Sequence, residues 1–231
     1  MKRRRPVVAI DGPTAAGKST VARGVARRLG LLYVDTGAMY RSVAVTALRR
    51  AIDLGDADAV TRLANSMVIE FRPAATGGEP SNRVLVDGED VTEAIRTPEA
   101  SDAASRVSVI GGVREAMVAR QRVMGTDGGV VMEGRDIGTV VFPDADVKVF
   151  LKASLETRAR RRHAELLARG QTVDLEEVRR SEAERDRRDE TRTHSPLRPA
   201  EGAVVLDTTT TTAEEVAEVI VRIVRERIGV V

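Results

Sequence analysis

The chain of 231 residues has no cysteine and no tryptophan, and only 2% of its residues are aromatic. Without cysteine it can form neither a disulfide framework nor a thiolate nucleophile. This composition suits a reducing compartment, and we expect the protein to be cytoplasmic. Only two histidines are present, His163 and His194, so any site chemistry has to rest mainly on other side chains.

Long apolar runs are also missing. No stretch approaches the roughly 20 apolar residues that span a bilayer. The run Val7–Ile10, which follows the basic opening residues, is too short for the apolar region of a signal peptide, and Asp11 ends it. We therefore expect neither a membrane anchor nor a secretion signal.

Lysine is scarce, and positive charge is almost fully balanced. Lysine and arginine total 37 against 35 acidic residues, a net charge of +2, and the lysines are Lys2, Lys18, Lys148 and Lys152. A surface for nucleic acid needs an excess of positive charge, and one for single strands also needs aromatic rings for stacking. The composition offers neither, so we expect no nucleic-acid partner.

A glycine loop is present near the start of the chain. Residues 12–19 read GPTAAGKS and match the pattern G-x-x-x-x-G-K-[ST] without a mismatch. An apolar run precedes the loop, and apolar residues at helical spacing follow it from Val21 to Leu29, where Gly30 suits a left-handed C-terminal cap. Strand, loop and helix are the context that this phosphate-binding pattern requires.

Each residue type in the loop has a physical role. Glycines let backbone N–H groups approach phosphate oxygens, and the helix that follows adds its own N–H groups and positive dipole end. Lys18 is expected to reach the β- and γ-phosphates of a bound nucleotide, and the Ser19 hydroxyl to bind Mg²⁺. The predicted residues of this phosphate-binding loop are Gly12, Pro13, Thr14, Ala15, Ala16, Gly17, Lys18, Ser19 and Thr20.

The chain alternates apolar runs with helical patterns, which predicts an α/β fold. A five-stranded parallel sheet flanked by helices follows, with its ligands at the carboxyl ends of the strands. The threonine run 208–212 indicates a loop and a helix N-cap. The predicted strands are Val7–Ile10, Leu31–Val34, Val130–Met132, Val147–Leu151 and Ala203–Leu206.

One region departs from this alternation. Residues 62–108 contain alternating apolar residues around a bend marked by Pro73, Gly77, Gly78 and Pro80, which predicts an antiparallel β insert. The rest, residues 1–61 and 109–231, would form the P-loop core.

Four segments together resemble the bacterial cytidylate kinases, a family of P-loop nucleoside monophosphate kinases. They read IDGPTAAGKST, DTGAMYR, EGRDIGTVVFPDADVKVFL and RDRRDETR, and they occur in order along nearly the whole chain. The resemblance implies transfer of the γ-phosphate of ATP, with Mg²⁺, to CMP or dCMP in pyrimidine metabolism. It also implies small-molecule substrates, no membrane or nucleic-acid partner, and a monomer.

The resemblance also assigns roles to single residues. Arg41 and Arg135 would hold the acceptor phosphate. The arginine-rich segment at about 156–172 would act as a lid, in which Arg161 and Arg162 would close over the donor phosphates as catalytic residues beside Lys18. Thr36 stands where the family often has serine, so its added methyl bears on packing near the base. Cytosine would be read by Thr36, Arg114, Asp136 and Arg192, and the ribose would be held by Ser105, Arg185 and Asp189.

Simpler interpretations stay open beside these roles. Arg185 and Asp189 are spaced i,i+4 and would stabilise any solvated helix, while Arg114 would be an ordinary exposed charge. Arg135 and Asp136 would form a salt bridge within their loop. Asp35 would either contact Mg²⁺ through a bound water or cap the start of a helix.

Two other functions also remain. Another small-molecule kinase on the same core would phosphorylate UMP or shikimate. A nucleotide-driven switch would hydrolyse NTP without an acceptor, although a GTPase would be expected to carry N-K-x-D, which does not occur in the sequence.

Overall fold

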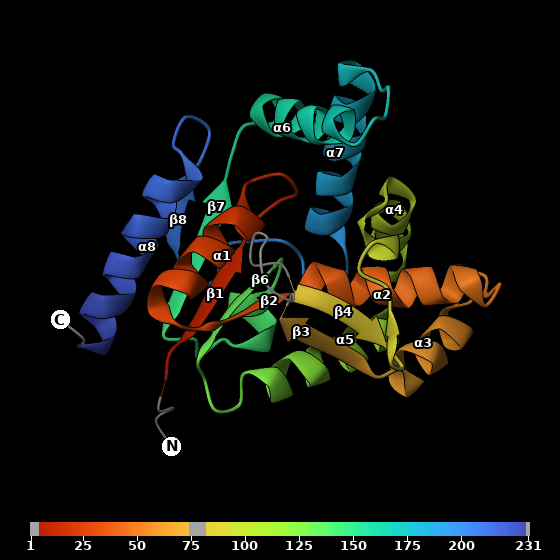
Figure 1. Ribbon diagram of the computed structural model, residues 1–231, viewed down its shortest axis with the longest axis horizontal. Coiled ribbons are helices and arrows are strands. Elements are labelled where there is room, and N and C mark those ends of the chain that lie inside the picture. Colours follow the sequence, from red (N-terminus) through yellow and green to blue (C-terminus); the bar gives the residue numbers. More distant parts are fainter. Residues whose placement is uncertain (1–4, 74–81, 230–231) are drawn as a thin grey trace. The chain divides into compact units, whose positions relative to one another are not determined.

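The computed structural model describes residues 5–73 and 82–229 (Figure 1). The chain divides into two compact units, one made of residues 1–32 and 127–231 and the other of residues 33–126.

The first unit is built on the parallel sheet, and the predicted fold class is confirmed. The sheet has five strands in the order β2-β6-β1-β7-β8, and helices flank it. Its strand β2 crosses the boundary between the units. The strands are β1 (Val7–Asp11), β2 (Leu32–Asp35), β6 (Val130–Gly134), β7 (Val147–Lys152) and β8 (Val204–Asp207).

Strand β1 lies at the centre of the sheet because it is apolar on both faces. Its residues Val7 to Ile10 are fully buried, and it pairs in parallel with β6 on one side and β7 on the other. Continuous apolar sequence of this kind is what a strand buried on both faces requires. The carboxyl end of β1 leads directly into the glycine loop, so the best-buried strand of the fold anchors the candidate site.

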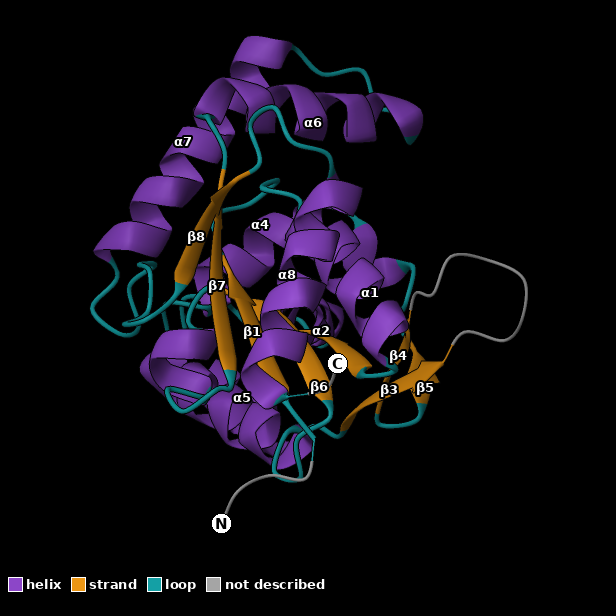
Figure 2. Ribbon diagram, turned by 90° about the vertical axis from the view of Figure 1, so that its left-hand side faces the viewer, coloured by secondary structure: helices purple, strands orange, loops and turns teal. Residues whose placement is uncertain are grey.

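Helices α1 (Lys18–Leu29) and α8 (Ala213–Ile228) pack against each other in this unit (Figure 2). The C-terminal end of α1 and the N-terminal end of α8, both predicted from sequence, are confirmed. Gly30 caps α1 in the left-handed conformation, and Thr212 begins α8 with a capping box that includes Glu215. The unit also contains α6 (Leu155–Ala168), α7 (Leu175–Thr191) and a single π-helical turn, η2 (Ile137–Val141).

The second unit has a separate three-stranded antiparallel sheet, which confirms the predicted β insert. The predicted turn residues Gly77, Gly78 and Pro80 lie outside the described residues, and Pro73 ends β3. Its strands are β3 (Ile69–Pro73), β4 (Asn82–Val86) and β5 (Glu89–Asp90), and its helices are α2 (Thr36–Arg49), α3 (Ala57–Ser66), η1 (Ala94–Arg96), α4 (Pro98–Val107) and α5 (Gly111–Met124).

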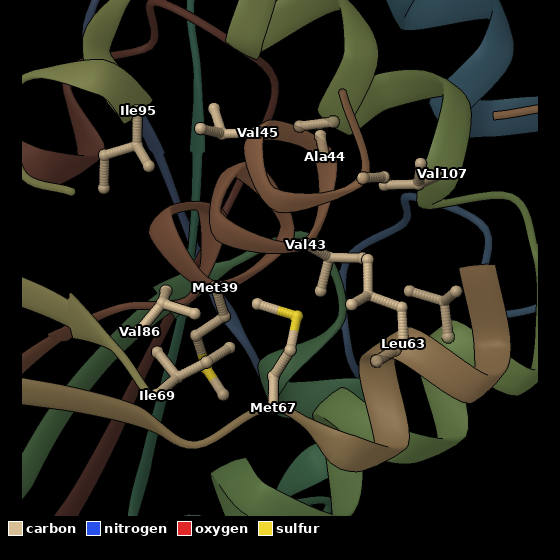
Figure 3. Close-up of a cluster of buried hydrophobic side chains, with 14 of the residues drawn as sticks. Met39, Val43, Ala44, Val45, Leu63, Met67, Ile69, Val86, Ile95 and Val107 are labelled. Atoms are coloured by element: carbon tan, nitrogen blue, oxygen red, sulfur yellow. The ribbon is translucent and has the colours of Figure 1, made fainter. Parts of the chain in front are cut away.

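The second unit holds its own hydrophobic core. Met39 and Val43 of α2 pack with Leu63 of α3, with Met67, and with Ile69 of β3, as Figure 3 shows. Burial of such side chains stabilises a fold by about 1.5–3 kcal/mol each. The core therefore fixes α2, whose first residue directly follows Asp35.

Gly12 lies where the fold leaves no room for a side chain. It has φ 151°, and a Cβ built there would lie 2.2 Å from the backbone oxygen of Leu151 on β7. Gly202 also has a positive φ, of 70°, but a Cβ there would meet nothing within 4 Å.

We therefore predict that Gly12→Ala destabilises the protein much more than Gly202→Ala. The control carries only the left-handed strain of about 1–2 kcal/mol, whereas Gly12→Ala adds a backbone clash of about 1–3 kcal/mol. Thermal unfolding should show a fall in Tm at least twice as large for Gly12→Ala. Equal Tm values for the two variants would contradict the close approach of the loop to β7.

Candidate active site

The glycine loop between β1 and α1 has the backbone shape of an anion site. Gly17 has φ 87° and Ala15 has φ 56°, so two loop residues occupy the left-handed region, which a non-glycine residue such as Ala15 rarely adopts. No side chain caps the start of α1. Its first N–H groups and the helix dipole are therefore directed at the loop, as phosphate binding requires.

Three consecutive carbonyl groups of the loop are held by donors from elsewhere in the first unit. Arg158 donates to the Thr14 oxygen at 3.4 Å, Arg161 to the Ala15 oxygen at 3.5 Å, and the Thr208 hydroxyl to the Ala16 oxygen at 3.0 Å. The N–H of a trans peptide points opposite to its C=O. Fixing these carbonyls on one side therefore directs the following N–H groups to the other side.

Lys18 is buried at the first position of α1. Its ammonium donates to the Pro13 oxygen at 2.6 Å. Burial, and after it repulsion by Arg135, lower the pKa of Lys18 to about 7, although Glu133 acts in the opposite direction. The Lys18 ammonium therefore lacks the stabilisation of its charge that water gives an ordinary lysine. An anion bound in the loop would stabilise this charge.

Arg135, in the turn after β6, is held from three directions. Its guanidinium donates to the Asp189 carboxylate at 2.8 Å, to the Thr14 hydroxyl at 2.7 Å and to the Gly134 oxygen at 3.2 Å. Burial alone would lower the Arg135 pKa, but Asp189 outweighs it and raises the pKa above its ordinary value. The predicted acceptor-phosphate arginine thus lies beside the ATP loop, fully charged.

Asp189 is not part of a solvated helix face, so the simpler interpretation of its i,i+4 spacing is wrong. Its side chain is 8% exposed and lies 3.8 Å from Arg192 as well as 2.8 Å from Arg135. Burial raises its pKa, but Arg135 and Arg185 outweigh this and hold it below the ordinary value. The structure therefore brings together Arg135, Arg185, Asp189 and Arg192.

Asp136 is buried and begins η2, but its side chain does not cap that turn. Asp11, the last residue of β1, takes this role: its two carboxylate oxygens accept from the N–H groups of Ile137 and Gly138, each at 2.8 Å. Sequence analysis identified Asp11 only as the end of an apolar run. Nothing local in the sequence indicates a partner 126 positions away.

The predicted lid arginines have different surroundings. Arg161 donates to the Thr208 hydroxyl at 3.2 Å and lies at the ATP loop. Arg162 pairs with Glu165 of its own helix at 2.9 Å, and Arg160 pairs with Glu156. Arg158, in the same predicted lid segment but not among the predicted clamps, is buried and binds Asp186 through both terminal nitrogens.

In the second unit, Asp35 and Arg41 form a pair. One Asp35 oxygen accepts from the Ala38 N–H at 3.0 Å and caps α2, and the other accepts from Arg41 at 2.8 Å. The cap predicted as one alternative for Asp35 is therefore present. Arg41 is held half-buried at the start of α2, where the carboxylate keeps its side chain in one orientation.

The other predicted residues of the second unit are buried. Arg114 lies over the Tyr40 ring, 5.7 Å from its centroid, and donates to the Ser108 oxygen at 3.2 Å, so it is not an ordinary exposed charge. Thr36 is buried at the first position of α2. The buried Ser105 hydroxyl oxygen finds no hydrogen-bond partner within the described residues. A buried hydroxyl left unpaired costs about 1–3 kcal/mol, so it favours a ligand.

The Lys18 pKa predicts a pH dependence of stability. The folded value of about 7 lies below the ordinary 10.5, so between these values the unfolded chain binds more protons than the folded chain. The free energy of unfolding therefore rises with pH in this window. We expect the Tm of the wild type to rise relative to that of Lys18→Met between about pH 7 and pH 10.

Lys152→Met is the matched control, because the Lys152 side chain is 56% exposed. Its Tm should stay parallel to that of the wild type over the same pH range. A constant Tm difference between the wild type and Lys18→Met would show that Lys18 keeps its ordinary pKa in the folded protein.

The chain matches the cytidylate kinase family over residues 8–226. It is 52% identical over 227 residues to a cytidylate kinase of Geobacillus kaustophilus, covering 98% of this chain and 100% of that one. It is also 52% identical over 223 residues to a bifunctional pantoate ligase/cytidylate kinase of a Synechococcus species. That match covers 96% of this chain and spans 41% of the length of the relative.

Among solved structures, an uncharacterized protein from Eubacterium ventriosum has a TM-score of 0.52 at 9% identity. The match covers 96% of this chain and 99% of that one, and it shows a shared fold. The family match and the curated relatives cover nearly the whole chain, including the loop, the Arg135 turn and α7. This protein belongs to the cytidylate kinase family.

Proposed function

We propose that the chain transfers the γ-phosphate of ATP to CMP or dCMP, giving ADP and CDP or dCDP. The observation that carries the proposal is the joining of the ATP loop to the Arg135 turn, through the 2.7 Å hydrogen bond between Arg135 and Thr14. Family membership and relatives named cytidylate kinase support phosphorylation of CMP or dCMP. They favour it over phosphorylation of UMP or shikimate, and over the function of a nucleotide switch.

The reaction requires positioning and positive charge rather than a base. The acceptor phosphate has a second pKa of about 6, so the attacking oxygen is already deprotonated at neutral pH. It attacks the γ-phosphorus in line, and the bond from that phosphorus to the β,γ-bridging oxygen breaks as ADP leaves. The residues of the first unit supply what this step needs: Lys18 for the donor phosphates and Arg135 for the acceptor phosphate.

Mg²⁺ belongs to the proposal as the partner of ATP. It is normally bound by phosphate oxygens, several waters and only one or two protein oxygens, so a dedicated cluster of ligands is unnecessary. Within residues 5–73 and 82–229, no group of three or more His, Asp or Glu side chains is placed to hold a metal. The Ser19 hydroxyl, in the first turn of α1, fits the single protein ligand that such a site uses. The bound ion would neutralise charge between the phosphates.

Water has to be excluded while the phosphoryl group moves. We assign this role to α6 and α7, whose contact is fixed by Arg158: it pairs with Asp186 at 2.5 Å and lies 3.9 Å from Glu182. Burial raises the Glu182 pKa, against the opposing effect of Arg185, Arg162 and Arg158. Arg161 and Arg162 stay the proposed clamps of the donor phosphates, and Arg161 already lies beside the loop.

Recognition of CMP is proposed for residues of both units. In the first unit, Asp136 and Arg192 would read the base, and Arg185 and Asp189 would hold the ribose. In the second unit, residues 62–108 form the proposed nucleotide-binding insert; Thr36 and Arg114 would read the base, Arg41 would bind the phosphate, and the unpaired Ser105 hydroxyl suits a ribose hydroxyl. We also propose that Asp35 contacts Mg²⁺ through a bound water, and that the protein is a cytoplasmic monomer.

Within the described residues, none of the helices combines the length and the apolar character needed to cross a membrane.

A panel of acceptors tests the proposed activity. We expect ADP release from ATP with Mg²⁺ to show kcat/KM values for CMP and dCMP at least about tenfold above those for UMP, AMP, GMP and shikimate. A higher value for UMP or shikimate would assign another kinase activity. ADP release that ignores every acceptor would instead indicate a nucleotide switch.

We expect the Asp136 carboxylate to make the enzyme prefer cytosine to uracil in its acceptor. Cytosine offers an amino donor at C4, which a carboxylate accepts, whereas uracil presents a carbonyl oxygen there. A mismatch of this kind costs about 1–3 kcal/mol, or about ten- to a hundredfold. We predict that Asp136→Ala lowers kcat/KM for CMP by such a factor and lowers the value for UMP much less.

The exposed Glu201 offers the control, since Glu201→Ala also removes one carboxylate and should leave both values unchanged. An equal loss for CMP and UMP in Asp136→Ala would show that Asp136 acts on the phosphate or on the loop and does not read the base.

A further inference from the structure

The turn made of Arg135 and Asp136 is held at both ends by one residue. On its near side, Gly134 ends β6 and is the register partner of Asp11 in the parallel pair of β1 and β6. On its far side, the N–H groups of Ile137 and Gly138 donate to the Asp11 carboxylate. The Asp11 backbone thus pairs with the strand before the turn, and its side chain binds the helix after it.

These two hydrogen bonds take the place of an ordinary helix cap. The first N–H groups of a helix have no partner within the helix, and an aspartate at the N-cap position normally satisfies one with its own side chain. Asp136 is at that position in η2 but makes no such bond. Because Asp11 binds both N–H groups, η2 can begin without the Asp136 carboxylate turning back onto its own backbone.

The residue after Asp11 is Gly12, where the ATP loop begins, and the Leu151 oxygen of β7 lies 2.2 Å from where a Cβ of Gly12 would be. Asp11 itself is only 3% exposed, so its hydrogen bonds are shielded from water. A single buried carboxylate therefore links the start of the donor loop to the turn that carries Arg135 and Asp136.

We infer that Asp11 is a positioning residue that directs Asp136 toward the acceptor base and keeps Arg135 in register with the donor loop. The inference rests on the proposed function, in which Asp136 reads cytosine. It assigns base discrimination in part to a side chain that touches neither nucleotide. Asp11 acts only through the two backbone N–H groups of η2.

Asp11→Asn is the discriminating variant. The amide keeps one acceptor oxygen but places an NH₂ group against the second backbone N–H, so one of the two hydrogen bonds is lost. Asp146→Asn is the matched control: an Asp146 oxygen accepts from the Val7 N–H at 2.8 Å, at the opposite end of the same strand. Both variants replace a carboxylate that accepts from backbone N–H groups with an amide, at η2 for Asp11 and at β1 for Asp146.

The readout is the ratio of kcat/KM for CMP to that for UMP, together with the affinity for a non-hydrolysable ATP analogue measured by calorimetry. For Asp11→Asn we expect the ratio to fall at least about fivefold with analogue affinity within about twofold of wild type. Asp146→Asn should keep the wild-type ratio. An Asp11→Asn ratio equal to that of the wild type, or equal losses for CMP, UMP and the analogue, would overturn the inference. A wild type that does not prefer CMP would instead refute the proposed function.

A second measurement needs no variant and covers the case in which Asp11→Asn does not fold. Burial raises the Asp11 pKa to about 6, so lowering the pH protonates the same carboxylate in the wild type. The charged groups that face it are Asp136, beside η2, and Lys18 of α1. Lys18 and the acceptor phosphate serve CMP and UMP alike, so their titration cancels in the ratio. We expect the ratio to fall between about pH 7.5 and 5.5 with a midpoint near 6; a flat ratio would overturn the inference.

Discussion

A site that brings the triphosphate of ATP to the phosphate of a nucleoside monophosphate has to hold several positive charges close together, and these charges repel one another when no ligand is bound. The first unit resolves this with carboxylates. The buried Asp189 neutralises Arg135, and the partly exposed Asp186 neutralises Arg158. Lys18 is the exception, because it is buried beside Arg135 and its pKa falls to about 7. The cation that is least compensated is thus the one that the phosphates of ATP are expected to meet.

Side-chain contacts also fix the orientation of backbone peptide groups in the site. Side chains from α6 and from the loop after β8 hold the carbonyl groups of the ATP loop, and Asp11 holds the first N–H groups of η2. Each of these contacts orients a peptide group before any ligand arrives. Preorganised dipoles of this kind stabilise charge in a transition state without reorganising during the reaction. Arg158, Thr208 and Asp11, which have no proposed contact with a nucleotide, thus orient the peptide groups of the site.

Local patterns made the fold predictable, whereas long-range contacts were not visible in the sequence. The apolar runs gave all five strands of the sheet, and Gly30 and Thr212 marked helix ends, because each signal lies within a few residues. The roles of Asp11 and Arg158 depend on partners more than 25 positions away. Asp189 follows the same rule: its spacing within α7 suggested a solvated helix face, but it is buried and pairs with Arg135, 54 positions away.

The central claim is that this arrangement delivers the γ-phosphoryl group to a nucleotide acceptor and not to water. Transfer from ATP labelled with ³²P at the γ-position tests it most directly, with CMP as acceptor and the products separated by chromatography. The account predicts that the label appears in CDP, one phosphoryl group for each ADP formed, with almost none in inorganic phosphate. Label that collects in inorganic phosphate while CMP remains unchanged would contradict it.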